Sequence, residues 1–229
     1  SLAPQLKDRL GDRRSLLGAL DRLKRDVDQS RVMESMDKYN QQAVNLLTSD
    51  RAQKAFDLSQ ESPKLRDKYG RHKWGQRALL ARRLVEAGTS FVTMQMQNPS
   101  VPGGIGNWDI HAVNGHLYDD ARARLPVFDQ AVSALIDDIY QRGLDKKVMV
   151  IVSGEFGRTP RISYAPSSGG GVASVAKGTR QPGRDHWPRA NTMLFSGGGI
   201  QTGQVIGATN RQGTDPISRR VGPGDFLAT

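Results

Sequence analysis

The chain has 229 residues, of which 37% are hydrophobic and 6% aromatic, enough for one sizeable α/β domain or a core with a helical appendage. It contains no cysteine, so disulfides and thiolate ligands are excluded and any metal must be held by His, Asp, Glu or backbone oxygen. The net charge is +10, but the basic residues alternate with acids and form no block with interleaved aromatics, so we expect no specific nucleic-acid binding. No apolar stretch is long enough to predict a membrane span.

The amino-terminal part has helical periodicity and no chemical signature. Apolar residues at helical spacing predict helices over 12–28, over about 30–47 and again after residue 49. We interpret residues 1–70 as a helical segment and residues 71–229 as an α/β domain with a metal site, together forming one continuous unit. The first residue is not methionine and the last residues, "PGDFLAT", resemble the start of a helix, so we expect truncation at both ends.

The pattern changes in the next part of the chain. Residues 77–87 form an amphipathic helical pattern that ends at Gly88, and residues 89–97 read as a strand. A loop rich in Pro and Gly follows. A long helix is then predicted over about 119–142, with Pro126 as a candidate kink or break.

The following strands suggest the fold class. Residues 147–153 are almost entirely apolar, as in the centre of a parallel sheet, and residues 191–196 form another strand before a turn at Gly197–Gly199. The Ser- and Gly-rich stretch 163–182 is typical of a mobile loop. This order predicts an α/β fold with a mainly parallel sheet flanked by helices. In such sheets the functional crevice lies beyond the carboxyl ends of the strands.

Three short motifs follow these strands or lead into them. In "NWDIH", Asp109 and His111 would point the same way if the segment is extended, so they could share an ion. An ordinary His–Asp hydrogen bond is the alternative. In "SGEFGRTP", Glu155 ends an apolar strand and, if buried, needs a cation or donors beside it. Arg158 could be its ion-pair partner, or it could hold an anion through its guanidinium fork.

The third motif is "GRDHWP". Asp185 and His186 are adjacent, and because neighbours in a strand point to opposite faces, both can serve one site only from a loop or turn. Gly183 and Pro188 favour a loop. The alternative is a capped loop that Trp187 anchors.

In combination the motifs favour a site for divalent metal over these structural alternatives. The metal would be Zn, Mn or Ca, and two ions could clamp a phosphoryl or sulfuryl group. The predicted ligands are Asp109, His111, Glu155, Asp185 and His186. Arg158 and Arg184 would orient the anionic group as catalytic residues. His116 could support the ligands, whereas His72 reads as a surface residue.

The motifs also carry a resemblance. "WDIH", "GEFGRTPRI", "GRDHWPRANTMLFSGGGI" and "GQVIGATNRQG", in this order, resemble a domain-of-unknown-function family of exported sulfatase-like proteins, grouped with the alkaline phosphatase and sulfatase superfamily. The upstream phrase "QKAFDLSQESPKLRDKYGRHKWGQRALLARRLVEAG" also fits. The resemblance implies an alkaline-phosphatase-like fold with the metal site at the strand ends. It also implies export to the periplasm, often by the twin-arginine route.

The chain departs from the family pattern in ways that limit this expectation. The family's amino-terminal part, which is expected to supply another metal-binding acid or the nucleophile region, has no counterpart here. The C/S-x-P-x-R signature of true sulfatases is also missing. We therefore expect a metal-dependent hydrolase of phosphate or sulfate esters, or a fragment of one, whose nucleophile is an activated water or a residue outside this chain. The alternative is a non-catalytic protein that binds sulfated or phosphorylated polysaccharide.

Overall fold

The computed structural model describes the chain over residues 38–40, 50–100, 102–103, 107–171 and 173–228. The chain divides into two compact units, Ser1–Gln60 and Glu61–Thr229. In the first unit, helix α3 (Asp50–Phe56) and the 3₁₀ helix η1 (Leu58–Gln60) are described, which confirms the helix predicted after residue 49. The helix predicted over 12–28 and most of the one over 30–47 lie outside the described residues.

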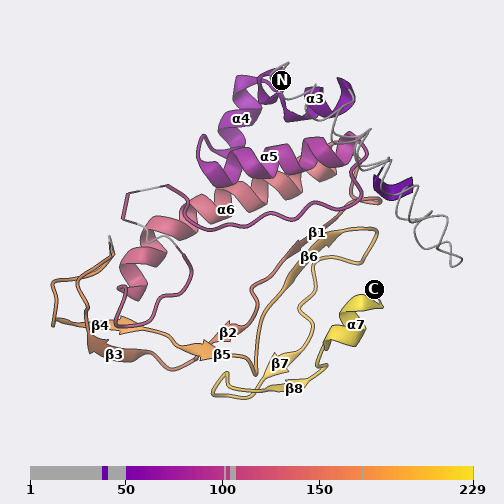
Figure 1. Cartoon of the computed structure of the whole chain (residues 1–229). Coiled ribbons are helices and arrows are strands. Elements are labelled where there is room, and N and C mark those ends of the chain that lie inside the picture. Colours follow the sequence, from indigo (N-terminus) through magenta and orange to yellow (C-terminus); the bar gives the residue numbers. More distant parts are fainter. Residues whose placement is uncertain (1–37, 41–49, 101, 104–106, 172, 229) are drawn as a thin grey trace, which may run out of the picture. The chain divides into compact units, whose positions relative to one another are not determined.

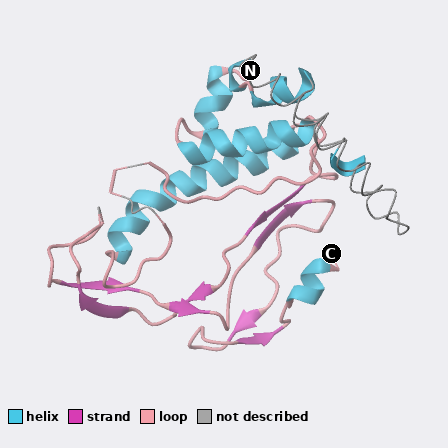
Figure 2. Ribbon diagram, in the orientation of Figure 1, coloured by secondary structure: helices cyan, strands magenta, loops and turns pink. Residues whose placement is uncertain are grey.

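The second unit contains three helices that pack on one another. They are α4 (Pro63–Tyr69), α5 (Lys73–Glu86) and α6 (Leu117–Gln141), and Figures 1 and 2 show α5 and α6 running side by side. A fourth, short helix, α7 (Pro223–Leu227), lies near the carboxyl end. The predicted helices over 77–87 and 119–142 are therefore confirmed, although each begins earlier than its periodicity indicated.

The earlier starts have a local cause, because a histidine caps each helix. His72 Nδ1 accepts the backbone N–H of Gly75 at 3.1 Å at the start of α5. His116 Nδ1 accepts that of Asp119 at 3.3 Å at the start of α6. Such a bond satisfies one of the unpaired N–H groups of the first turn. Pro126 lies inside α6 without dividing it.

The core of the three helices is apolar with a polar layer. Its buried apolar side chains are Tyr69, Trp74, Ala78, Leu79, Ala131, Val132, Ala134, Leu135 and Ile139. The small alanines among them let neighbouring helices approach closely, so the larger rings and leucines can fill the space between.

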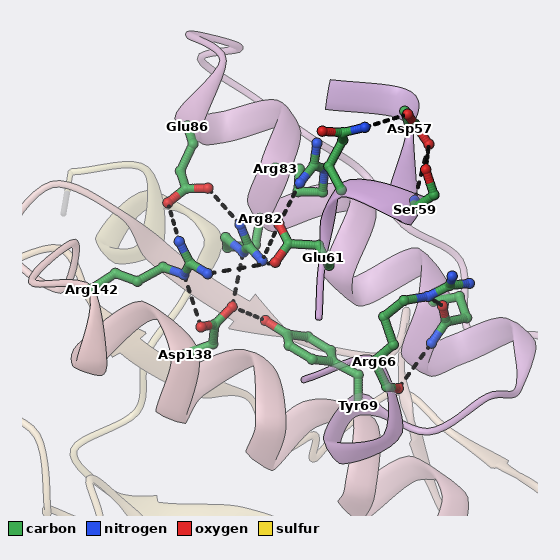
Figure 3. A network of polar contacts seen from close by, with 12 residues as sticks. Asp57, Ser59, Glu61, Arg66, Tyr69, Arg82, Arg83, Glu86, Asp138 and Arg142 are labelled. Carbon is green, nitrogen blue, oxygen red and sulfur yellow. Dashed lines mark hydrogen bonds and ion pairs between the residues drawn. The ribbon is translucent and has the colours of Figure 1, made fainter. Parts of the chain in front are cut away.

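A network of ion pairs crosses this core (Figure 3). The side chain of Arg82, only 1% exposed, meets carboxylate oxygens of Glu61 at 3.0 Å, Glu86 at 2.6 Å and Asp138 at 2.9 Å. Tyr69 Oη donates to Asp138 Oδ2 at 2.9 Å. Burial, together with the charge of Asp138, raises the pKa of Tyr69. The network joins α4, α5 and α6 to the residue that opens this unit, Glu61.

The described strands form only two-stranded antiparallel sheets. The pairs are β1 (Met149–Val152) with β6 (Leu194–Gly197), β2 (Gly157–Arg158) with β5 (His186–Trp187), β3 (Ser163–Pro166) with β4 (Arg180–Gly183), and β7 (Ala208–Thr209) with β8 (Pro216–Ser218).

The first three pairs are nested and form one long ribbon. Met149 pairs with Gly197, Gly157 with Trp187 and Ser163 with Gly183, so the register between the two arms shifts by only two residues at β2–β5. The chain therefore runs outward through β1, β2 and β3 and returns through β4, β5 and β6, as Figure 1 shows. We call Met149–Gly197 the ribbon. Its nearly constant register places residues far apart in sequence opposite each other.

The predicted mainly parallel, alkaline-phosphatase-like sheet is wrong for this structure. Within the part of the chain that the structure describes, the apolar strand β1 has one partner, β6, and that partner is antiparallel. With one partner the strand is not fully covered, and Ile151 is 41% exposed.

The predicted strand over 89–97 also joins no ladder among the described residues. Side chains take its carbonyl groups instead: Trp74 Nε1 donates to Gln97 O at 3.1 Å, and Trp108 Nε1 to Met96 O at 2.6 Å. The segment is thus extended but held by indole donors, so it contributes no strand to a sheet.

Of the two remaining loop predictions, one is wrong in part and one is confirmed. The stretch 163–182 is not loop throughout, because its ends form β3 and β4. The turn at Gly197–Gly199 is confirmed, since the three residues have φ of 82°, 65° and 77°, a region that favours glycine.

Candidate metal centre

The loop that carries the first predicted ligands is fixed to the helices by an aromatic cluster. Trp108 stacks on Trp74 of α5 with ring centres 5.5 Å apart and meets Phe128 of α6 edge-on at 5.8 Å. The guanidinium of the buried Arg124 lies 4.5 Å above the Trp108 ring. These contacts fix the backbone directly before Asp109.

Backbone packing then brings the returning strand of the ribbon to this loop. Arg184 N donates to Ile110 O at 3.1 Å. A Cβ on Gly183 would lie 2.0 Å from the backbone nitrogen of Ala112, so only glycine allows this approach. Because Ile110 is buried, its neighbours Asp109 and His111 are left to face the ribbon.

The outgoing strand meets the same place through the nested register. Arg158 of β2 pairs directly with His186 of β5. Thr159 and Asp185 continue the contact: Thr159 N donates to Asp185 O at 2.9 Å, and Asp185 N donates to Thr159 Oγ1 at 3.1 Å. The ribbon thereby places the guanidinium of Arg158, the carboxylate of Asp185 and the imidazole of His186 beside the loop that carries Asp109.

One carboxylate oxygen is the centre of the arrangement. Oδ1 of Asp109 lies 2.9 Å from His111 Nε2, 2.7 Å from His186 Nε2 and 2.8 Å from Arg158 Nη2. The two imidazole nitrogens are themselves 3.3 Å apart. One ligand atom from each of Asp109, His111 and His186 thus lies within 4.8 Å of the others. Two imidazole nitrogens and a carboxylate oxygen are a donor set that suits zinc and similar ions.

Asp185 acts on the other side of His111. Its Oδ1 lies 2.9 Å from His111 Nδ1, and Ser163 Oγ donates to its Oδ2 at 3.5 Å. A carboxylate on Nδ1 fixes the orientation of an imidazole whose Nε2 faces a metal. Asp185 was predicted as a direct ligand. It instead contacts His111 at Nδ1, the nitrogen that does not contact Asp109, and lies outside the group of Asp109, His111 and His186.

The site keeps its central carboxylate ionised. Partial burial raises the pKa of Asp109, but the hydrogen bonds from His186 and Arg158 and the charges of His111 and Arg158 outweigh this and lower the pKa to about 2. The carboxylate of Asp109 is therefore anionic at any pH near neutral.

Two predicted residues have other positions. Glu155 is exposed in the bend between β1 and β2 and is not in the converging group found among the described residues. The alternative of a buried Glu155 paired with Arg158 is wrong, since Glu155 is exposed and Arg158 pairs with Asp109. Arg184 donates to the backbone oxygens of Thr159 at 2.5 Å and Arg158 at 3.1 Å, so it supports the strand that carries Arg158.

Sequence reasoning missed Phe156, whose ring centre lies 4.4 Å from that of His186. Its place between Glu155 and Gly157 in the quoted motif was the available signal, because an aromatic residue there can pack on the facing strand. His116, considered as support for the ligands, caps α6 instead.

The chain matches the model of a known protein family. A family model described as a protein of unknown function (DUF1501) matches residues 3–229. The chain belongs to this family. No curated protein and no solved structure matches the chain. The DUF1501 match covers every motif residue discussed above, so the candidate centre lies within the family's own region.

The prediction of no membrane span holds for the part of the DUF1501 chain that the structure describes, where no helix is both long enough and apolar enough to cross a bilayer.

Proposed function

We propose that this DUF1501 chain is a metal-dependent hydrolase of phosphate or sulfate esters, or a part of one. The supporting observation is the convergence of Asp109, His111 and His186 within 4.8 Å, with the guanidinium of Arg158 on the same carboxylate oxygen. A cation site beside a positively charged anion clamp is the combination that ester hydrolysis of this class needs.

The donor set fits a divalent cation. Two neutral imidazoles and one carboxylate suit zinc or manganese better than calcium, which prefers oxygen ligands throughout. When bound, such an ion supplies Lewis-acid stabilisation of charge that develops on an ester oxygen, and three protein ligands leave a coordination position for water or substrate.

The chain's own residues have distinct roles in this proposal. Asp109, His111 and His186 hold the cation, and Asp185 orients His111 through Nδ1. Arg158 orients the phosphate or sulfate group, because a guanidinium presents paired N–H donors to such oxygens. Arg184 stabilises the backbone from which Arg158 projects. The exposed ring of His186, 49% accessible at its side chain, leaves an approach for substrate.

We also propose a relation to the alkaline phosphatase and sulfatase superfamily and export to the periplasm. Both rest on the resemblance of the site motifs alone, because the antiparallel strand pairs of the described residues do not match the parallel sheet that this relation implies.

Hydrolysis of p-nitrophenyl phosphate and p-nitrophenyl sulfate tests the proposal. We expect turnover with Zn²⁺ or Mn²⁺ and a loss of at least about 100-fold in His186→Ala, which removes a ligand. His116→Asn is the matched control, because it removes an imidazole outside the cluster while keeping a capping oxygen at the start of α6. Equal rates in wild type and His186→Ala would contradict the proposal.

One observation favours the alternative, a protein that binds sulfated or phosphorylated polysaccharide. The net charge is +10, and the ribbon and the segment after it expose Arg161, Lys177, Arg180, Arg189, Arg211, Arg219 and Arg220. Under this alternative, binding to immobilised heparin weakens steeply with salt and survives both Glu155→Ala and His186→Ala. Absence of turnover combined with that result would favour the alternative.

A further inference from the structure

Arg158 is held at the centre by more than its ion pair. Its Nη2 donates to Asp109 Oδ1 at 2.8 Å and to Trp108 O at 3.1 Å, and its Nη1 donates to Arg184 O at 3.4 Å. The two carbonyl acceptors belong to the loop and to the returning strand. The guanidinium would therefore stay at the site if Asp109 were engaged elsewhere.

The oxygen that Arg158 contacts is the one that a cation would use. Oδ1 of Asp109 lies 2.9 Å from His111 Nε2 and 2.7 Å from His186 Nε2. A divalent cation coordinated by Oδ1 between the two imidazoles would withdraw negative charge from that oxygen and repel the guanidinium, so the hydrogen bond from Arg158 to Oδ1 would weaken.

We propose that Arg158 couples cation binding to anion binding, because its guanidinium and a divalent cation compete for Oδ1 of Asp109. This rests on the metal site of the proposed function. Arg158 lowers the affinity of the centre for the cation. A bound cation in turn frees a guanidinium N–H, held in place by the two carbonyl groups, for a sulfate or phosphate oxygen.

Charge sets the direction of both effects. A guanidinium a few ångströms from a divalent ion repels it, and this repulsion in a half-exposed site corresponds to about tenfold in affinity. Coupling is reciprocal, so an anion that neutralises the guanidinium tightens cation binding by the factor by which the cation tightens anion binding.

The test is a calorimetric titration with Zn²⁺ of wild type, Arg158→Gln and Arg158→Lys. We expect Arg158→Gln to bind zinc about tenfold more tightly than wild type, and Arg158→Lys, which keeps the charge, to remain close to wild type. Arg180→Gln is the matched control: it removes one positive charge from an exposed arginine that donates to Tyr164 O, and its zinc affinity should equal that of wild type.

A second titration uses inorganic sulfate with and without saturating Zn²⁺. In wild type we expect zinc to tighten sulfate binding by about tenfold, and in Arg158→Gln we expect this factor to fall severalfold. If Arg158→Gln is unstable in thermal unfolding, Arg158→Met gives the same comparison, because it keeps the apolar stem without the charge.

The outcomes separate the two proposals. Zinc binding by wild type that is equal or weaker in Arg158→Gln overturns the coupling and leaves the metal site standing. No zinc binding by wild type or by either neutral variant overturns the metal site and the coupling together. Zinc binding that appears only in the neutral variants supports the competition.

Discussion

The second unit contains two clusters of arginine and carboxylate that differ in how their charges are arranged. In the helical core, Arg82 contacts three different carboxylates, and all three also contact Arg142, at 2.9, 3.1 and 3.8 Å. At the candidate metal centre, three nitrogen-bearing side chains converge on one oxygen of Asp109. The first cluster is buried at Arg82, whereas the second keeps 43% of the Asp109 side chain exposed.

We interpret this difference as the one between a structural network and a candidate binding site. Where each buried charge has several partners of opposite sign, the network has no reason to accept another ion, and its removal affects folding. Where donors converge on one oxygen of a half-exposed carboxylate and two imidazole nitrogens lie 3.3 Å apart, the same oxygen and nitrogens could coordinate a cation. Counting arginines and acids does not distinguish the two, but the sharing of one acceptor does.

The largest effect on stability is expected when Arg82 is removed from the ion-pair network of the helices. Arg82→Met removes the more buried of the two arginines that Glu61, Glu86 and Asp138 share, so we expect the free energy of unfolding to fall by about 3–5 kcal/mol. Chemical denaturation followed by circular dichroism measures this. Arg71→Ala, which breaks the exposed pair with Asp67, should cost less than about 1 kcal/mol. A similar loss in both variants would remove the distinction between the clusters.

At the metal centre, the next largest effect is expected at Asp185. Asp185→Ala removes the acceptor on His111 Nδ1, and we expect zinc affinity to fall by about 10–100-fold with little change in stability. Asp185→Asn keeps an acceptor oxygen and should recover most of the affinity. If Asn is as damaging as Ala, Asp185 is a direct ligand and its separation from the three-residue group is wrong.

The buried network should also be recognisable by its pH dependence. Burial raises the pKa of Glu61, but the hydrogen bond from Arg83 and the charge of Arg82 outweigh this and lower it below 4.5. A carboxylate whose pKa is lower in the folded state stabilises the fold above the unfolded pKa, and this contribution is lost as the pH falls through the folded value. We expect Glu61→Gln to lower the free energy of unfolding by about 2 kcal/mol at pH 7. The difference from wild type should shrink below pH 4.5.

Denaturation of both proteins from pH 7 down to pH 3 would show this trend. A difference that stays constant over that range would mean that the ionised carboxylate of Glu61 is not what stabilises the helices.

The smallest effect is expected at Glu155. Because Glu155 is exposed and outside the converging group, Glu155→Ala should leave zinc affinity within about twofold of wild type and stability within about 0.5 kcal/mol. Thermal unfolding and zinc titration of this variant test it. A large loss of zinc affinity would restore Glu155 as a ligand.

The helices were predictable and the sheet was not, for a physical reason. The periodicity of α5 and α6 depends on residues three or four apart, which a local pattern contains. The pairing of β1 with β6 depends on residues such as Met149 and Gly197, far apart in the chain. The apolar run before Glu155 is equally compatible with a central parallel strand and with one side of an antiparallel ribbon.

The centre itself was predicted in part. Asp109, His111 and His186 were identified because Asp and His are the ligands available to a chain without cysteine. Glu155 was predicted as a ligand because it ends an apolar strand, with a pair between Glu155 and Arg158 as the alternative. The contact of Arg158 with Asp109 was not predictable, because it depends on the packing of the loop on the ribbon. The alternation rule led to a predicted loop from which Asp185 and His186 would both serve as ligands. His186 instead begins strand β5, and the two residues contact opposite nitrogens of His111.

The most direct test is a zinc titration by calorimetry of wild type, Asp109→Asn and His186→Ala, with His116→Asn as the control. We predict about one ion bound per chain in wild type and in His116→Asn, and a loss of at least about 100-fold in zinc affinity in Asp109→Asn and His186→Ala. Failure of wild type to bind zinc or manganese, or equal affinity in all four proteins, would contradict it.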